Sequence, residues 1–430
     1  MMMRRSFIFV FLTAMLACCS AEAQEMLSWK ECLLEAAKYN PDIIAANESV
    51  KYERASKAVT ESGLFPQIRG SFSVENSMTT TASAASGTVR AMSDSYGMGI
   101  SATQLLFDGF KTPYDVKAVS ENIQAAQHSF TFDSAQVRYN LRSAFVNLLK
   151  AQALVSVSEE IVKIRRDSLE LITLRYHSGL EHKGAMLTAE ANVAQAQYEF
   201  SQALRSILTY QRQLNQYLGR NEFIPLRVKG TFEIQEPVSD NPDFESLAAR
   251  NPSVLKAAAE KGSAAFGIRS AYANFSPELT ASASFDKTMN AWPKKPRTGW
   301  DVGLGVSVPI FEGGLKVAQV HQAYASYRQR LASEKSIKDG AISDLQEKWN
   351  ALLDSLDAVT VKQKILQAAL ERSKIAEAQY SIGFVSFDDW IIIQNELVNA
   401  KKAFLEAQAL VVLTEAGWIR AKGETLEYAN

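Results

Sequence analysis

The sequence contains one structural unit twice, and this duplication limits the possible folds more than any other feature. Short landmarks recur first at a shift of 211 residues and later at a shift of 204 residues. In order, the pairs are Asn40-Pro41 with Asn251-Pro252, Leu106-Phe107-Asp108-Gly109 with Ile310-Phe311-Glu312-Gly313, and Tyr176-x-x-Gly179 with Tyr380-x-x-Gly383. The shift changes between residues 77 and 96, where we expect a longer loop in the first copy.

Long helices are predicted for most of each copy. No proline lies in 114–224 or 310–430, and no glycine lies between Lys111 and Ser178. A period of seven residues, typical of helices packed along a supercoiled seam, runs through both copies. Its positions are Leu141, Leu148, Val155, Val162, Leu169 and Tyr176, then Leu345, Leu352, Val359, Leu366, Ser373 and Tyr380. One helix from Tyr114 to Tyr176 would extend about 95 Å. A soluble coiled-coil rod would explain these segments equally well.

Four other segments alternate apolar and polar residues and are predicted to be strands: 68–75, 96–103, 279–286 and 300–310. This period is typical of transmembrane β-barrel strands, although a soluble sandwich gives a similar pattern. Tyr96, Trp292 and Trp300 would fit an interfacial girdle or an ordinary surface. Four strands cannot close a barrel in lipid. Three chains supply about twelve strands, which predicts a homotrimer.

The first 23 residues are expected to be a signal peptide. Arg4 and Arg5 precede the apolar stretch 6–17, and Ala21-Glu22-Ala23 is suited to cleavage before Gln24. The alternative is a lipoprotein signal in which Cys18 becomes lipidated. No later apolar run approaches the ~20 residues of a membrane-spanning helix. Cys32 is expected to be a small apolar residue on a helix.

The composition disfavours several classes of function. Lys and Arg number 46 against 47 Asp and Glu, so no basic footprint suggests nucleic acid. Four His and three Cys are few for a metal site or a disulfide framework. His177 and His182, with Glu181 nearby, could bind a metal, but loop histidines commonly bind nothing. No G-x-S-x-G, H-E-x-x-H or P-loop pattern occurs. We therefore expect no enzyme, no cofactor and no metal.

Taken together, the landmarks resemble those of the TolC-like outer-membrane efflux protein family. The resemblance rests on both Asn-Pro pairs, both strand-to-helix turns, and the hairpin motifs RYHSGL at 175–180 and QYSIGF at 379–384. It implies a mixed α/β membrane protein of the bacterial outer membrane that extends into the periplasm. Long antiparallel helical hairpins would form a periplasmic α-barrel, and four transmembrane strands per chain would build a trimeric 12-stranded β-barrel.

The resemblance also implies a division of the chain and a set of partners. The expected parts are a first repeat at 28–219, an equatorial linker region at 220–245, a second repeat at 246–425 and a tail at 426–430. Each repeat would comprise a helix, a strand pair and a long helical hairpin. The homotrimer would contact outer-membrane lipid and dock to a periplasmic adaptor (membrane fusion) protein. An inner-membrane pump, such as an RND or ABC transporter, would drive tripartite efflux or type I secretion through this passive duct.

The resemblance places the functional residues at the two hairpin tips. Gly179, Leu180, Gly383 and Phe384 would contact the adaptor, although the glycines also serve to turn the chain. Asp388 and Asp389 would line the channel constriction and attract cations. The alternative is that both aspartates only cap a helix. The family's basic residue after the tip glycine is replaced by Val385, and a further acid by Ile392.

A second interpretation is an exported coiled-coil structural or adaptor protein that is not inserted in the membrane. Such a protein should carry one helical hairpin within a β domain. Here the hairpin and the strand pair each occur twice, which favours the channel.

Overall fold

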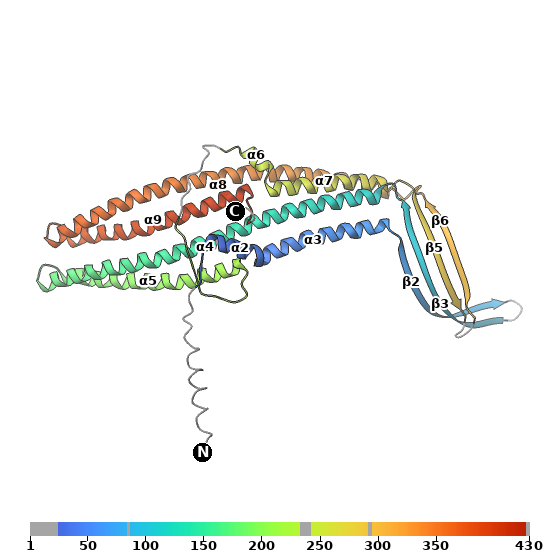
Figure 1. Ribbon diagram of the computed structural model, residues 1–430, viewed down its shortest axis with the longest axis horizontal. Helices are drawn as coiled ribbons and strands as arrows, with labels where there is room; N and C mark the ends of the chain where they lie inside the picture. Colours follow the sequence, from blue (N-terminus) through green and yellow to red (C-terminus); the bar gives the residue numbers. More distant parts are fainter. Residues whose placement is uncertain (1–24, 84–86, 233–241, 291–294, 427–430) are drawn as a thin grey trace, which may run out of the picture. The chain divides into compact units, whose positions relative to one another are not determined.

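A computed structural model of the chain describes residues 25–83, 87–232, 242–290 and 295–426 (Figure 1). The expected signal peptide with Cys18, Trp292 and the end of the tail lie outside the described residues. The chain divides into two compact units. Unit 1 comprises Met1–Ala45, Thr131–Leu247 and Ile342–Asn430, and unit 2 comprises Ala46–Phe130 and Ala248–Ala341. Each unit therefore takes segments from both copies of the repeat.

Unit 2 contains a four-stranded antiparallel sheet in the order β2-β3-β5-β6. The strands are β2 (Gln67–Ser83), β3 (Gly87–Phe107), β5 (Glu278–Met289) and β6 (Arg297–Ser307). One row across the sheet is Gly70, Ile100, Phe285 and Trp300, and the adjacent row is Arg69, Ser101, Ser284 and Asp301. Because neighbouring rows point to opposite faces, one face carries apolar residues and the other polar ones, as the alternation predicted.

Two details of the strand predictions were wrong. The extra residues of the first copy are paired strand and not a loop, since the ladder continues from Ser77 opposite Ser93 to Ser83 opposite Gly87. A run of threonines at 79–81 favours this extension, because β-branched residues suit strands. The last strand ends at Ser307 and not at residue 310. Pro309 has no backbone N–H to donate to a ladder.

We expected one helix at the start of each repeat, with the Asn-Pro pair inside it. In the structure, each Asn-Pro pair instead separates two helices. Asn40 lies between α2 (Trp29–Tyr39) and α3 (Pro41–Glu61), and Asn251 lies between α6 (Phe244–Ala249) and α7 (Pro252–Ala273). In each pair the asparagine Oδ1 accepts a backbone N–H two residues on, at 2.9 Å from Asp42 and from Ser253. Asparagine at the cap and proline at the first helical position both favour a new helix start.

The remaining helices are the two long pairs predicted by the sequence. They are α4 (Lys111–His177) with α5 (Lys183–Leu218), and α8 (Leu315–Ser381) with α9 (Phe387–Lys422). Every position of both seven-residue series is buried or half-buried, with Leu141, Leu148 and Leu345 completely so. The predicted seam is therefore confirmed. None of the helices in the described part of the chain is both long and apolar enough to cross a membrane.

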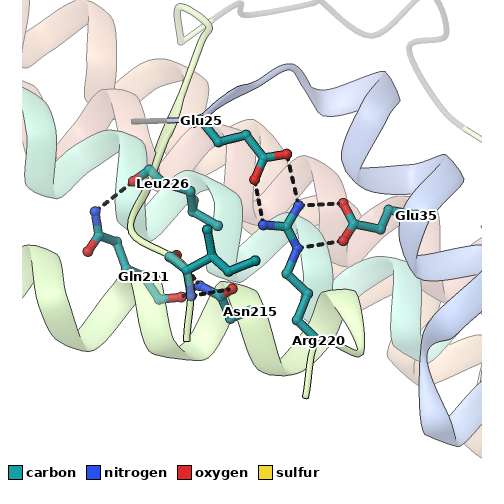
Figure 2. Close-up of polar contacts among 7 residues, drawn as sticks. Glu25, Glu35, Gln211, Asn215, Arg220 and Leu226 are labelled. Atoms are coloured by element: carbon teal, nitrogen blue, oxygen red, sulfur yellow. Dashed lines mark hydrogen bonds and ion pairs between the residues drawn. The ribbon is translucent and has the colours of Figure 1, made fainter. Parts of the chain in front are cut away.

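A small parallel pair, β1 (Glu25–Leu27) with β4 (Leu226–Val228), lies in unit 1. Arg220 holds this region together (Figure 2), because its guanidinium contacts Glu25 at 2.6 Å and Glu35 at 2.8 Å. Gln211 donates to the carbonyl of Leu226 at 2.6 Å. These contacts attach the end of α5 to α2. The strand at 226–228 lies within the expected linker region 220–245, of which residues 233–241 are not described.

Two residues near Arg220, Gly219 and Cys32, are closely packed. Gly219 ends α5 with φ 80°, and a Cβ atom there would lie 2.0 Å from the carbonyl oxygen of Tyr39. Only glycine fits this position. Cys32 is completely buried, and burial, followed by the charge of Glu35, raises the pKa of its thiol to about 12. It is therefore an inert packing residue, as predicted.

Candidate functional site

The two hairpin tips of unit 1 share one backbone design. Each long helix ends at a glycine in the left-handed region, with φ 73° at Gly179 and 84° at Gly383. In both tips the N–H of the next residue bonds back across the turn at 2.9 Å, from Leu180 to Arg175 and from Phe384 to Gln379. This six-residue closure is the Schellman motif, which satisfies carbonyls at a helix C-terminus. The glycines therefore turn the chain, as the sequence predicted.

The helix that returns from each tip starts at an equivalent capped residue. The Nδ1 atom of His182 accepts the N–H of Ala185 at 3.1 Å, and the Oγ atom of Ser386 accepts the N–H of Asp389 at 3.1 Å. Residues 182 and 386 are 204 positions apart, so they are equivalent in the two copies. His182 thus has a structural role at the start of α5. No group of three or more metal-ligating side chains is found anywhere in the described ranges.

Side chains of the first tip contact residues of the second tip. Arg175 donates from Nη1 to the carbonyl of Tyr380 at 3.0 Å and lies over the Tyr380 ring, 4.7 Å from its centre. The Tyr380 hydroxyl donates to Glu181 at 2.9 Å. The Tyr380 ring stacks on Trp390 with centroids 4.5 Å apart and planes 5° apart. We call Arg175, Glu181, Tyr380 and Trp390 the tip clasp.

The clasp is set in a small apolar core, and that burial makes it strong. Tyr380 and Trp390 are each 1% exposed. Around them pack Ile172, Ala185, Ala189, Ala376 and Phe387. Burial, followed by the neighbouring Glu181, raises the pKa of Tyr380 well above its usual value. The hydroxyl therefore stays protonated and remains a donor to the carboxylate throughout the physiological range.

The structure places the predicted contact residues on the outside of the tips. Leu180 is 66% exposed and Phe384 is 81% exposed, and both glycines are exposed as well. Large apolar side chains at a loop tip, with no cover from their own chain, are typical of an interaction site. The adaptor contact itself stays a prediction.

Asp388 and Asp389 both lie exposed in the first turn of α9. Asp389 is engaged with the cap, because its carboxylate accepts the Ser386 hydroxyl at 2.7 Å while its N–H donates to the same hydroxyl. Acidic residues in a first helical turn also interact favourably with the helix dipole. The helix cap itself is Ser386, and Asp389 is the residue whose N–H it accepts. A role of either residue in a constriction stays a prediction, since it involves several chains.

The tip clasp was not predicted from the sequence. There, Tyr380 is recognisable only as a position of the repeat, and Glu181 only as a neighbour of two histidines. A signal was present in the differences between the copies. At a shift of 204, Arg175 of the first copy corresponds to Gln379 of the second, Glu181 corresponds to Val385, and Met186 corresponds to Trp390. Charged residues in one copy and a large aromatic residue in the other, at positions where the partner copy differs, indicate that the two tips contact each other asymmetrically.

A sheet of alternating polarity together with two long capped helical hairpins defines the class of outer-membrane channel subunits with a helical periplasmic part. The family model for outer membrane efflux proteins matches residues 33–220 and 244–423, and the chain belongs to this family. It is accordingly an export channel of the outer membrane that extends into the periplasm. The family resemblance found in the sequence is confirmed.

Two curated relatives and two solved structures illustrate the match. The chain is 22% identical to the outer membrane efflux protein BepC of Brucella suis over 91% of this chain and 84% of the relative. It is 24% identical to TolC of Escherichia coli over 74% of this chain and 67% of the relative. A Pseudomonas aeruginosa membrane protein superposes with a TM-score of 0.80 at 17% identity, covering 91% and 92% of the chains. For CusC the TM-score is 0.79 at 17% identity, covering 91% of each chain.

Proposed function

We propose that three copies of this chain close a twelve-stranded barrel and form a passive export duct. The observation that carries the proposal is the four-stranded sheet. Within the described residues, β2 and β6 each have one neighbouring strand and so present an open edge. The strands alternate in direction, so β6 of one chain would pair antiparallel with β2 of the next. Open edges are not stable in lipid, and ring closure removes them.

The exposed apolar residues of β6 support the same arrangement. Trp300, Val302 and Leu304 are each at least 73% exposed and lie on one face of the strand. Facing lipid would bury this apolar stripe, while the polar row that contains Ser284 and Asp301 would line the lumen. The hydroxyl of Ser284 donates to the carboxylate of Asp301 on that face.

The oligomeric mass of the detergent-extracted protein tests this proposal. We expect three chains per particle, recovered from the outer-membrane fraction. Leu304→Lys should reduce membrane insertion, because a lysine facing the bilayer midplane costs about 2–4 kcal/mol. Ser282→Lys is the control. Ala281 pairs with Leu304, and Ser282 is the next residue along β5, so its side chain points to the opposite face and the variant should insert normally. A water-soluble monomer or dimer would contradict the duct and favour the coiled-coil rod.

We propose that the two tips dock a periplasmic adaptor protein, through which an inner-membrane pump drives export. The exposed Leu180 and Phe384 supply apolar contact area. Nearby, a groove of about 780 Å³ between α4, α8 and α9 is lined by acidic and basic side chains, including Asp167, Lys374 and Glu377. An apolar anchor beside polar partners is the usual composition of a binding surface.

Phe384→Asp tests the docking proposal. It should impair export and cross-linking to the adaptor while the trimer remains intact, because the residue makes little contact within its own chain. Val361→Asp is the matched control, since Val361 is 53% exposed on α8 at a distance from the tip in sequence. Normal export by Phe384→Asp, or equal impairment by both variants, would count against the tip as the docking site.

We propose that Asp388 and Asp389 give the duct a preference for cations. Three chains would place six carboxylates around one axis. Asp388→Asn combined with Asp389→Asn should weaken cation selectivity in planar-bilayer conductance. Asp354→Asn, which removes an exposed aspartate in the middle of α8, should leave selectivity unchanged. Unchanged selectivity in the double variant would remove these residues from the constriction.

A further inference from the structure

The turn between β3 and α4 holds a phenylalanine in a strained backbone conformation. Among the described residues, Phe110 is the one non-glycine residue with a positive φ, at 68°. A bulky side chain is rarely found in this left-handed region, because its Cβ atom crowds the backbone. Such strain persists where the surrounding structure imposes it or a function uses it. The strain at Phe110 therefore calls for an explanation.

The second copy of the repeat makes the same turn without this strain. Each turn has two consecutive residues with positive φ, Gly109 and Phe110 in the first copy and Gly313 and Gly314 in the second. At Gly109 a Cβ atom would lie 2.2 Å from that of Ser276, so only glycine fits there. Gly314 is 204 positions after Phe110 and is its equivalent. The turn itself thus needs no phenylalanine, and the use of Phe110 must lie in its ring.

The ring of Phe110 has little cover from its own chain. The residue is 60% exposed, and its ring meets that of Phe107 edge-on, with centroids 5.6 Å apart and planes 85° apart. Phe107 is exposed as well. The two phenylalanines therefore present a pair of neighbouring rings to whatever surrounds the chain at this turn.

A β-bulge places Phe107 on the apolar face of the sheet. The pairing of β3 with β5 shifts between Leu105 and Phe107, which puts Phe107 opposite Leu279. Leu279 in turn lies opposite Val306 of β6. Val306 is exposed and lies on the same face of β6 as Leu304, two residues before it. Bulges commonly redirect a side chain, and this one continues the exposed apolar stripe up to the turn.

We propose that Phe107 and Phe110 anchor the chain in the headgroup boundary of the periplasmic leaflet, and that the strained turn is kept because it holds the second ring there. The anchor rests on the proposed barrel, whose apolar face meets lipid and whose helices extend into the periplasm. Aromatic residues flank the apolar band of membrane barrels, and phenylalanine is readily buried where headgroups meet acyl chains. With glycine at 314, the second copy lacks this ring pair.

Fluorescence quenching in vesicles of phosphatidylethanolamine and phosphatidylglycerol tests the anchor. The full chain carries a fluorophore on one introduced cysteine, Phe110→Cys, Val302→Cys or Phe132→Cys, since the native Cys32 is completely buried. Lipids with a nitroxide near the headgroup should quench the label at 110 most strongly. Lipids with a nitroxide deep in the acyl chain should quench the label at 302 most strongly. Phe132 is exposed further along α4 and is the matched control, which neither lipid should quench.

The three labels separate the anchor from the barrel. Quenching at 302 without quenching at 110 would overturn the anchor and leave the barrel in place. No quenching at either position would overturn both.

Two substitutions of Phe110 separate the ring from the backbone. Phe110→Gly removes the ring and relieves the strain, as in the second copy, whereas Phe110→Ala removes the ring and keeps a Cβ atom at positive φ. Both variants should insert severalfold less efficiently from urea into the same vesicles, and Phe132→Ala should insert like the wild type. In detergent, Phe110→Gly should melt at a higher temperature than Phe110→Ala.

These outcomes can contradict either half of the proposal. Insertion of Phe110→Gly at the wild-type level would show that the ring does not anchor the chain. Equal melting temperatures of Phe110→Gly and Phe110→Ala would show that no strain is held at this turn.

Discussion

The two hairpin tips have the same backbone and different side chains. Both close with a glycine at positive φ, and both return through a capped helix start at equivalent positions. Tyr176 of the first tip is half-buried beside His177, whereas its equivalent Tyr380 is buried against Trp390. The two tips thus share one turn but differ in their side chains. Arg175 and Glu181 of the first tip donate to and accept from Tyr380 of the second tip.

This asymmetry has a mechanical consequence. Arg175 and Glu181 belong to the first hairpin, and Tyr380 and Trp390 belong to the second, so the clasp ties together two hairpins that are distant in sequence.

Of the substitutions at the tips, Tyr380→Ala should lower the stability of the protein most. It removes a buried ring with its stacking on Trp390, a cation–π contact and the hydrogen bond to Glu181, and should lower the free energy of unfolding by about 3–5 kcal/mol. Tyr176→Ala, the equivalent change in the other tip, should cost clearly less because its side chain is only half-buried. Thermal unfolding measures both. Equal losses in the two variants would mean that the tips are equivalent after all.

Substitution of the tip glycines tests the backbone, which has the same conformation in both tips, so the two substitutions should have equal effects on stability. Gly179→Ala and Gly383→Ala each force a Cβ atom into the left-handed region, which costs about 1–2 kcal/mol. Neither Cβ atom would meet another atom within 4 Å, so the two costs should agree. Gly340→Ala is the control, because Gly340 lies inside α8 with open space around it and the substitution should stabilise the helix by up to about 1 kcal/mol. Unequal costs at the two tips would argue against a common closure.

Removal of the caps should have a smaller effect. Ser386→Ala and His182→Ala each delete one side-chain acceptor at a helix start, at a cost of about 1 kcal/mol. Amide hydrogen exchange in the first turns of α5 and α9 measures the local loss. Ser178→Ala serves as the control, since its hydroxyl bonds to the carbonyl of Leu174 in the preceding helix and not to a returning one. Faster exchange at α9 in Ser178→Ala would show that the caps do not act locally.

Sequence periodicity predicted the regular parts of the fold because each period has one physical cause. The seven-residue series follows the buried seam of the helices, and the two-residue alternation follows the two faces of the sheet. Glycine at the tips was predictable because few other residues accept positive φ. The family model supports the same overall interpretation.

The failures share a different cause, because they depend on pairing partners that no period in the sequence reveals. The paired extension of β2 and β3 depends on cross-strand neighbours, and the clasp depends on contacts between residues about 200 positions apart. The strand β1 was missed because three residues carry no period, and its pairing with β4 is visible only in the fold.

The smallest effect concerns the proton on Tyr380. Its pKa is raised in the folded protein, so below about pH 10, the usual tyrosine value, both the folded and the unfolded chain hold the proton and the clasp contributes fully. Above that pH the unfolded chain loses the proton first, and the free energy of unfolding falls. Tyr380→Phe keeps the stacked ring but cannot ionise. The wild type should therefore melt at a higher temperature than Tyr380→Phe at pH 8, and the gap should narrow as the pH rises past 10. A constant gap would mean that the hydroxyl of Tyr380 is not held in the folded tip, and that the asymmetry between the tips rests on ring packing alone.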